Sequence, residues 1–178
     1  MKWTSAILIL ILGLTSFYDT EPNEYPIPPD KRERLFYIQR NHNRNTIVYD
    51  ANFDEQGNLN HKKPIDVYWI RYEEDGRRME LREIEKIFAY GVKCVEKNQP
   101  DSQFRVKIVA AEDRKFQLIQ KNPFVADIHT SINKKPSILE HLYIFADNSG
   151  FWPKVKYIEL FGRDAASGAD NYEKITIQ

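Results

Sequence analysis

From residue 35 onward the chain alternates short apolar or aromatic runs with turn-forming residues, and this alternation most limits the folds open to it. The runs LFYIQR and DVYWIRY are rich in the aromatic and β-branched residues that strands favour. Segments rich in Asn, Gly or Pro, such as NHNRN and EEDGR, follow such runs as turns. The pattern predicts strands at 35–40, 46–53, 66–72, 89–96, 103–110, 115–120, 124–132, 137–146, 155–161 and 173–177.

Short strands joined mostly by turns predict antiparallel pairing in an all-β or β-rich α+β domain. The expected architecture is a closed or partly open barrel, with a sandwich as the alternative. A parallel α/β sheet would need helices between its strands, and one helical pattern is visible, at 81–88. There, apolar residues recur at three- and four-residue spacing opposite a charged face; they are Leu81, Ile84, Ile87 and Phe88. We expect this short helix to plug one end of the domain or to lie across the sheet.

Two predicted strands carry apolar side chains on both faces. In 66–72, Tyr68, Ile70 and Tyr72 alternate with Val67, Trp69 and Arg71. In 137–146, one face is expected to hold Leu139, His141, Tyr143 and Phe145. A half-solvated strand alternates apolar with polar residues, so both faces of these strands must be covered. Inward aromatics line a ligand cavity in some β proteins and simply fill the core in others, and both interpretations stay open.

The N-terminal residues are typical of a secretory signal. Lys2 precedes an uncharged apolar run at 6–14, shorter than the roughly 20 residues of a membrane span. We therefore expect a signal peptide at 1–18 and a periplasmic or extracellular protein, with an uncleaved anchor as the alternative because no A-x-A site is present. Residues 19–34 hold four prolines and many charges, which predicts an extended linker. Residues 35–178 are long enough for a single domain with a substantial core.

Charge and composition exclude some classes of function. The 26 basic and 26 acidic residues balance to a net charge of zero, whereas nucleic-acid-binding domains usually carry a basic stripe. The histidines at 42, 61, 129 and 141 are too far apart for a zinc motif, so we expect no metal and no cofactor. Cys94 is the single cysteine and cannot form an internal disulfide; its strand-like setting suggests a buried, inert thiol.

Two arginines at the ends of strongly apolar strands are candidates for ligand binding. Arg40, with Asn41 beside it, and Arg71, with Trp69 nearby, would suit the mouth of an aromatic cavity, where a guanidinium binds carboxylate or phosphate. The alternative is that both reach solvent or pair with strand-end carboxylates such as Glu73.

Asp127 and His129 share one face of the strand predicted at 124–132. A carboxylate two residues from a histidine can orient the imidazole as a general base. The alternative is a solvent-facing polar strip, and no nucleophile motif accompanies the pair. We therefore assign no catalytic residue and consider an enzyme less expected than a binding protein.

The strings LFYIQRN at 35–41, PIDVYWIRY at 64–72 and YIELFG at 157–162, with TIVY and AYG between them, resemble an exported bacterial family known only as a domain of unknown function. The resemblance implies export and single-domain size, and no activity or site residue.

Three functions are compatible with these observations. The first is an exported module that binds a small, partly apolar ligand, and the second is a structural or interaction protein of the cell envelope. The third is a hydrolase or isomerase that uses Asp127 and His129. An internal cavity would favour the first, and a solid core with an exposed apolar patch the second.

Overall fold

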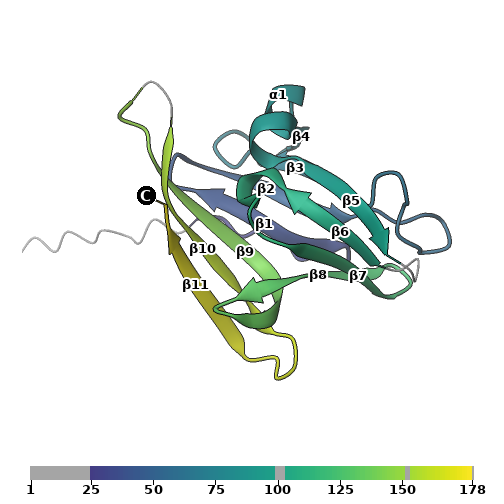
Figure 1. Ribbon diagram of the computed structural model, residues 1–178. Helices are drawn as coiled ribbons and strands as arrows, with labels where there is room; N and C mark the ends of the chain where they lie inside the picture. The colour runs from purple at the N-terminus through teal and green to yellow at the C-terminus, as the bar shows by residue number, and fades with distance from the viewer. Residues whose placement is uncertain (1–24, 99–102, 151–152, 178) are drawn as a thin grey trace, which may run out of the picture.

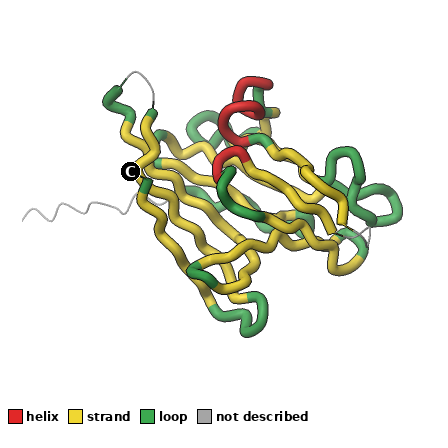
Figure 2. Tube along the Cα trace, in the orientation of Figure 1, coloured by secondary structure: helices red, strands yellow, loops and turns green. Residues whose placement is uncertain are grey.

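The computed structural model describes residues 25–98, 103–150 and 153–177, and its described part consists mostly of strands (Figure 1). The strands are β1 (Arg34–Arg40), β2 (Asn43–Ala51), β3 (Ile65–Ile70), β4 (Arg78–Glu80), β5 (Val92–Asn98), β6 (Gln103–Ile108), β7 (Phe116–Asn122), β8 (Val125–Ile132), β9 (Lys135–Asp147), β10 (Lys154–Asp164) and β11 (Asp170–Thr176). Helical residues form α1 (Glu83–Glu85), which continues into a π-helical turn, η1 (Lys86–Tyr90), and a 3-10 turn, η2 (Val109–Ala111) (Figure 2). The prediction of a β-rich fold with one short helix near 81–88 is confirmed.

The strands form one branched sheet, and the branch point is β9. One edge of β9 pairs with β10, which pairs in turn with β11. The other edge is shared: its first residues, from Lys135 to Ile138, pair antiparallel with β8, and residues from His141 to Ile144 pair parallel with β1. Two arms therefore leave this edge, one ordered β1-β2-β3-β4 and the other β8-β7-β6-β5.

The two arms face each other as the layers of a sandwich do, and the sheet does not close into a barrel (Figure 1). The closed-barrel form of the prediction is thus wrong. The sheet stays open because β9 is long enough for two strands to share one of its edges, and the two arms then leave in separate directions. The parallel pairing of β1 with β9 also departs from the expected antiparallel pattern.

The core lies between the arms and is filled by aromatic and aliphatic side chains. Phe36 of β1 stacks on Tyr49 of β2 with ring centroids 4.1 Å apart, and both side chains are fully buried. The opposite arm contributes Phe104 and Phe116, which are equally buried. Burying one such side chain contributes about 1.5–3 kcal/mol relative to leaving it exposed. These contacts support the filled core, the plainer of the two interpretations of the inward aromatics.

The prediction that β3 is buried on both faces is confirmed. Val67 and Trp69 belong to the core between the arms. Tyr68 and Ile70 point the other way and form a second buried cluster with Val48.

Residues 25–33, here called the N-terminal strap, lie across the outer face of the first arm and of β9. The hydroxyl oxygens of Tyr25 and Tyr143 are 3.4 Å apart, and Gln39 Nε2 donates a 2.9 Å hydrogen bond to the Pro26 carbonyl. Tyr72 Oη donates to the Ile27 carbonyl at 3.3 Å. The strap is therefore the layer that covers part of the outer tyrosines.

A β-bulge at Glu140 switches the face on which side chains of β9 lie. Consecutive residues Phe161 and Gly162 of β10 pair with His141 and Leu139, so Glu140 is the extra residue. Leu139 is consequently in the core, and the expectation that it shares a face with His141 is wrong. Close strand approach requires glycine here, because a Cβ at Gly162 would lie 2.1 Å from the Ile138 carbonyl oxygen.

The helical segment turns most of its apolar side chains to solvent. An amphipathic helix on a domain normally buries its apolar face, yet Ile84, Ile87 and Phe88 are 61%, 54% and 76% exposed. Leu81 alone of the predicted apolar positions is buried. The segment is short, and Glu85 points inward because its carboxylate is bound there, as described below.

Within the described ranges, no helix is long and apolar enough to cross a lipid bilayer. The predicted signal peptide at 1–18 and the Cys94 side chain lie outside what the structure describes.

Candidate functional site

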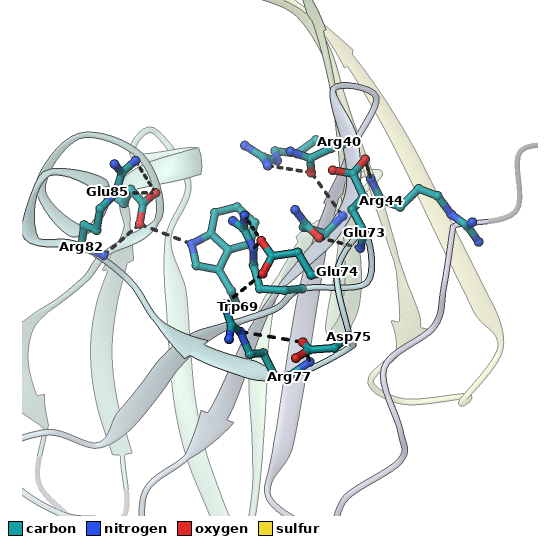
Figure 3. Close-up of polar contacts among 12 residues, drawn as sticks. Arg40, Arg44, Trp69, Glu73, Glu74, Asp75, Arg77, Arg82 and Glu85 are labelled. Atoms are coloured by element: carbon teal, nitrogen blue, oxygen red, sulfur yellow. Dashed lines mark hydrogen bonds and ion pairs between the residues drawn. The ribbon is translucent and has the colours of Figure 1, made fainter.

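Arg40 and Trp69, both predicted to bind ligand, meet beside the helical segment (Figure 3). The guanidinium carbon of Arg40 lies 4.7 Å from the Trp69 ring centroid and 5.3 Å from that of Tyr90. Arg40 Nη1 donates to Tyr90 Oη at 2.5 Å, and Nη2 donates to Asn43 Oδ1 at 3.0 Å. The cation is thus held between two aromatic rings, an arrangement worth about 0.5–2 kcal/mol per contact.

Glu85 closes this cluster from the helical side (Figure 3). It accepts hydrogen bonds from Trp69 Nε1 at 3.3 Å and from the Arg82 backbone N–H at 2.8 Å. Partial burial opposes ionisation, but the hydrogen bonds from Arg82 and Trp69 outweigh it and lower the pKa of the Glu85 carboxyl. Tyr49 Oη also donates to the Tyr90 carbonyl at 2.8 Å. The cluster therefore fastens the helical segment to the sheet with the protein's own groups.

The other two residues predicted at this mouth lie apart from the cluster. Asn41 extends the pairing of β1 with β9, because its side chain donates to the Ala146 carbonyl at 2.8 Å and accepts from the Ala146 N–H at 2.9 Å. Arg71 sits in the turn after β3 and donates to Glu74 Oε1 at 2.6 Å. This contact matches the alternative to ligand binding, in which Arg71 pairs with a carboxylate at the end of its strand. The partner is Glu74, whereas Glu73 was the example expected.

Asp127 and His129 lie on the outer face of β8 but line different grooves. Among the described residues no hydrogen bond joins them, and the nearest cation to Asp127 is Lys121, 3.9 Å away. Burial lowers the pKa of His129, and Lys121 lowers it further against the opposing effect of Asp127. The geometry does not form the carboxylate–imidazole hydrogen bond that a general base would use.

A row of four aromatic rings crosses the outer face of the sheet, with one exposed ring at its end. Tyr37, His141, Phe161 and Tyr172 occupy directly paired positions on β1, β9, β10 and β11. Successive ring centroids are 4.5, 4.9 and 5.1 Å apart. The row ends at Tyr172, which is 45% exposed and lies on an edge strand.

His141 is held neutral inside this row. Burial between Tyr37 and Phe161 lowers its pKa to about 4. Its Nε2 has no hydrogen-bond partner among the described residues. The imidazole therefore acts as one more stacked ring at neutral pH.

Two open grooves of about 350 and 230 Å³ run beside the aromatic row, and Glu140 lines both. We call them together the trough. Its aromatic and polar sides face the same space; the polar groups include Asp30, Asp127, Glu140, Arg163, Asp170 and Asn171. Glu140 is fixed by an ion pair with Arg163 at 2.5 Å, and Tyr172 Oη donates to Glu159 Oε1 at 2.7 Å.

The aromatic row was missed because it depends on pairing between distant strands. The sequence around His141 could have indicated that it packs among aromatic rings, since it lies between aromatic residues in a strand predicted to be apolar on both faces. Nothing in the sequence aligns it with Tyr37, more than a hundred residues earlier, because that register comes from the parallel pairing of β1 with β9.

Within the described ranges, no group of three His, Cys, Asp or Glu side chains is placed to hold a metal ion. A family model described as a domain of unknown function matches residues 36–174, so the expectation of an uncharacterised family is confirmed. No curated protein and no solved structure matches the chain.

Proposed function

Because the chain belongs to the family Domain of unknown function (DUF4833), whose description assigns no activity, we propose a function from its geometry: the domain is a carbohydrate-binding module. The binding surface is the trough with the aromatic row, on the outer face of β9, β10 and β11. This is a specific form of the small, partly apolar ligand expected from the sequence.

The observation that carries the proposal is the aromatic row with its exposed terminal ring. A sugar presents apolar C–H groups on the faces of its ring and hydroxyl groups around its rim. Aromatic side chains offer large, rigid apolar surfaces on which the C–H faces can pack. Carboxylates, amides and guanidinium groups form hydrogen bonds with the hydroxyl groups. Tyr172 and Phe161 provide the first kind of group, and Glu140 and Asp170 provide the second within the same groove.

The rigidity of the trough also supports the proposal. All its aromatic rings stand on strands, and each contacts the next ring. The hydrogen bond from Tyr172 to Glu159, which also lies 3.5 Å from Lys174 Nζ, orients the terminal ring before any ligand arrives. Preorganised side chains lose little entropy on binding. The predicted signal peptide would in addition deliver the domain to a compartment where glycans are abundant.

An interaction protein of the envelope remains the second candidate, favoured by the exposed Ile84, Ile87 and Phe88. Three such side chains expose on the order of 300–400 Å², the size of the largest apolar patch on many monomers. A standard protein interface buries about 800 Å² on each partner. The aromatic trough, which also carries directional polar groups, is therefore the better-supported site.

The test is isothermal titration calorimetry of the purified protein with soluble cello-, chito-, malto- and xylo-oligosaccharides. We expect saturable binding of at least one of them and a loss of about tenfold or more in Tyr172→Ala. Phe88→Ala removes an exposed aromatic ring elsewhere, 76% exposed against 45% for Tyr172, and should bind as the wild type does. Absence of binding to all four classes, or equal affinity in Tyr172→Ala, would overturn the proposal.

A further inference from the structure

A second groove, separate from the trough, lies on the outer face of β7 and β8 and under the β8–β9 hairpin. Its volume is about 450 Å³. Cations from three different segments line it, and they are Arg105, Lys115 and Lys134. We propose that this basic groove is an anion-binding site that takes a phosphate or carboxylate group of a ligand.

The charge of the basic groove is the first argument. No Asp or Glu is among the residues that line it, although the whole chain has equal numbers of acidic and basic residues. Lys115 and Lys134 form no ion pair with any residue in the described ranges. Two ammonium groups that lack carboxylate partners at one groove create a local positive potential, which attracts an anion.

The groove also offers uncharged hydrogen-bonding groups. Gln117 and Ser131 line it from neighbouring strands, and both are exposed. Lysine ammonium groups and hydroxyl groups both donate to anionic oxygens, and charge-assisted hydrogen bonds are about twice as strong as neutral ones. Tetrahedral phosphate and planar carboxylate share this recognition chemistry.

The backbone at Lys134 is the second, independent argument. Asn133 and Lys134 form the two-residue turn between β8 and β9, with φ of 49° and 64°. Such a turn favours Asn followed by Gly, because both positions need positive φ. Lysine is strained at the second position, and the turn is held by a 2.8 Å hydrogen bond from the Asn133 N–H to Glu173 Oε2. Strain of this kind gathers at functional sites, and here it places a cation at the groove.

His129 supplies a reporter inside the groove. It faces Gln117 on β7 and Ile138 on β9 in the strand pairing. Its charged surroundings are Lys121 and Asp127, with Arg105 and Lys115 in the same groove. An anion bound beside these cations would raise the pKa of His129 and shift its ring signals. With four histidines in the chain, loss of one signal in His129→Gln identifies it.

The experiment is an NMR titration of the His129 ring signals with inorganic phosphate and, separately, with acetate, at ionic strength held constant by chloride. We expect a saturable shift and a raised His129 pKa. Affinity should fall at least fivefold in Lys115→Ala and in Lys134→Gly. Lys62→Ala, which removes an exposed cation elsewhere, should leave it unchanged.

Lys134→Gly adds a readout that a purely structural role would not produce. Glycine relieves the positive-φ strain, so this variant should melt at a higher temperature while it binds phosphate more weakly. A stronger response to phosphate than to acetate assigns a phosphorylated ligand, and the reverse assigns a carboxylate. No shift beyond the chloride reference, or equal shifts in all variants, would overturn the site. Tyr172→Ala should keep phosphate binding, so the result does not depend on the carbohydrate proposal.

Discussion

The ring of Phe124 lies against the α-carbon of Gly57, and both residues have positive φ, 61° and 83°. The Phe124 N–H also donates to the Gly57 carbonyl at 3.0 Å. This contact ties the turn after β2 to the β7–β8 hairpin, so it joins the two arms of the sheet at one end.

We expect Gly57→Ala to destabilise the protein by about 2–4 kcal/mol, from left-handed strain together with overpacking. A Cβ at position 57 would lie 2.8 Å from the Phe124 ring and 2.9 Å from Pro123 Cβ. Urea unfolding measures the loss. Gly76→Ala is the matched control, because Gly76 also has positive φ but no heavy atom would lie within 4 Å of its Cβ. It should cost about 1–2 kcal/mol, and equal losses in the two variants would contradict the packing argument.

Stability should fall in acid because of His141. The unfolded chain protonates this imidazole near pH 6.5, whereas the folded protein resists protonation until about pH 4. The folded state therefore binds fewer protons between these values, and stability is lost as the pH falls from 6.5 to 4. The full effect is about 3 kcal/mol.

His141→Phe keeps a stacked ring and removes the titration. The unfolding free energies of wild type and variant are measured from pH 7.5 to pH 4. Over this range the wild type should lose about 3 kcal/mol of stability relative to His141→Phe. His42→Gln, at an exposed position, should leave the wild-type pH dependence intact. A constant difference between wild type and His141→Phe would show that His141 is not held neutral.

The contact between Arg40 and Tyr90 should couple the sheet to the helical segment. A double-mutant cycle of Arg40→Met and Tyr90→Leu should give a coupling free energy on the order of 1 kcal/mol, since it removes both a cation–aromatic contact and a hydrogen bond. Chemical denaturation of the four proteins measures it. Arg44→Met with Tyr90→Leu is the control pair and should be additive, because no interaction is seen between those two side chains in the described structure.

The apolar side chains on the outward face of the helical segment should contribute little to the stability of the protein. Ile87→Ser and Phe88→Ser should change the unfolding free energy by less than about 0.5 kcal/mol, because exposed positions contribute little. Leu81→Ala should cost about 2–5 kcal/mol, since Leu81 is buried. Equal, large losses at all three positions in thermal melts would mean that the apolar face is buried in solution.

Much of the secondary structure could be predicted because it depends on local spacing. The runs around Trp69 and His129 are strands in the structure, and the helical pattern at 81–88 overlaps a helical segment from 83 to 90. The three-residue strand β4 was missed, because Arg78–Glu80 has no apolar alternation of its own and exists as an edge of β3. The ligand-binding residues were predicted less well: Arg40 and Trp69 meet, but outside the trough. Asn41 and Arg71 lie apart from that pair, Asp127 lines the trough, and His129 lines the basic groove.

The amino-acid sequence by itself determined where most of the strands lie, that β3 is covered on both faces, and that the charge is balanced. Each of these follows from the order of neighbouring residues. The tertiary structure alone decided that β9 pairs with both β8 and β1, that Leu139 and His141 lie on opposite faces, and that four rings align across four strands. These outcomes depend on contacts between distant segments, above all the close approach of Gly162 to Ile138 and the register of Tyr37 with His141. No local pattern encodes such a register, because it is set by the free energy of the whole packed sheet.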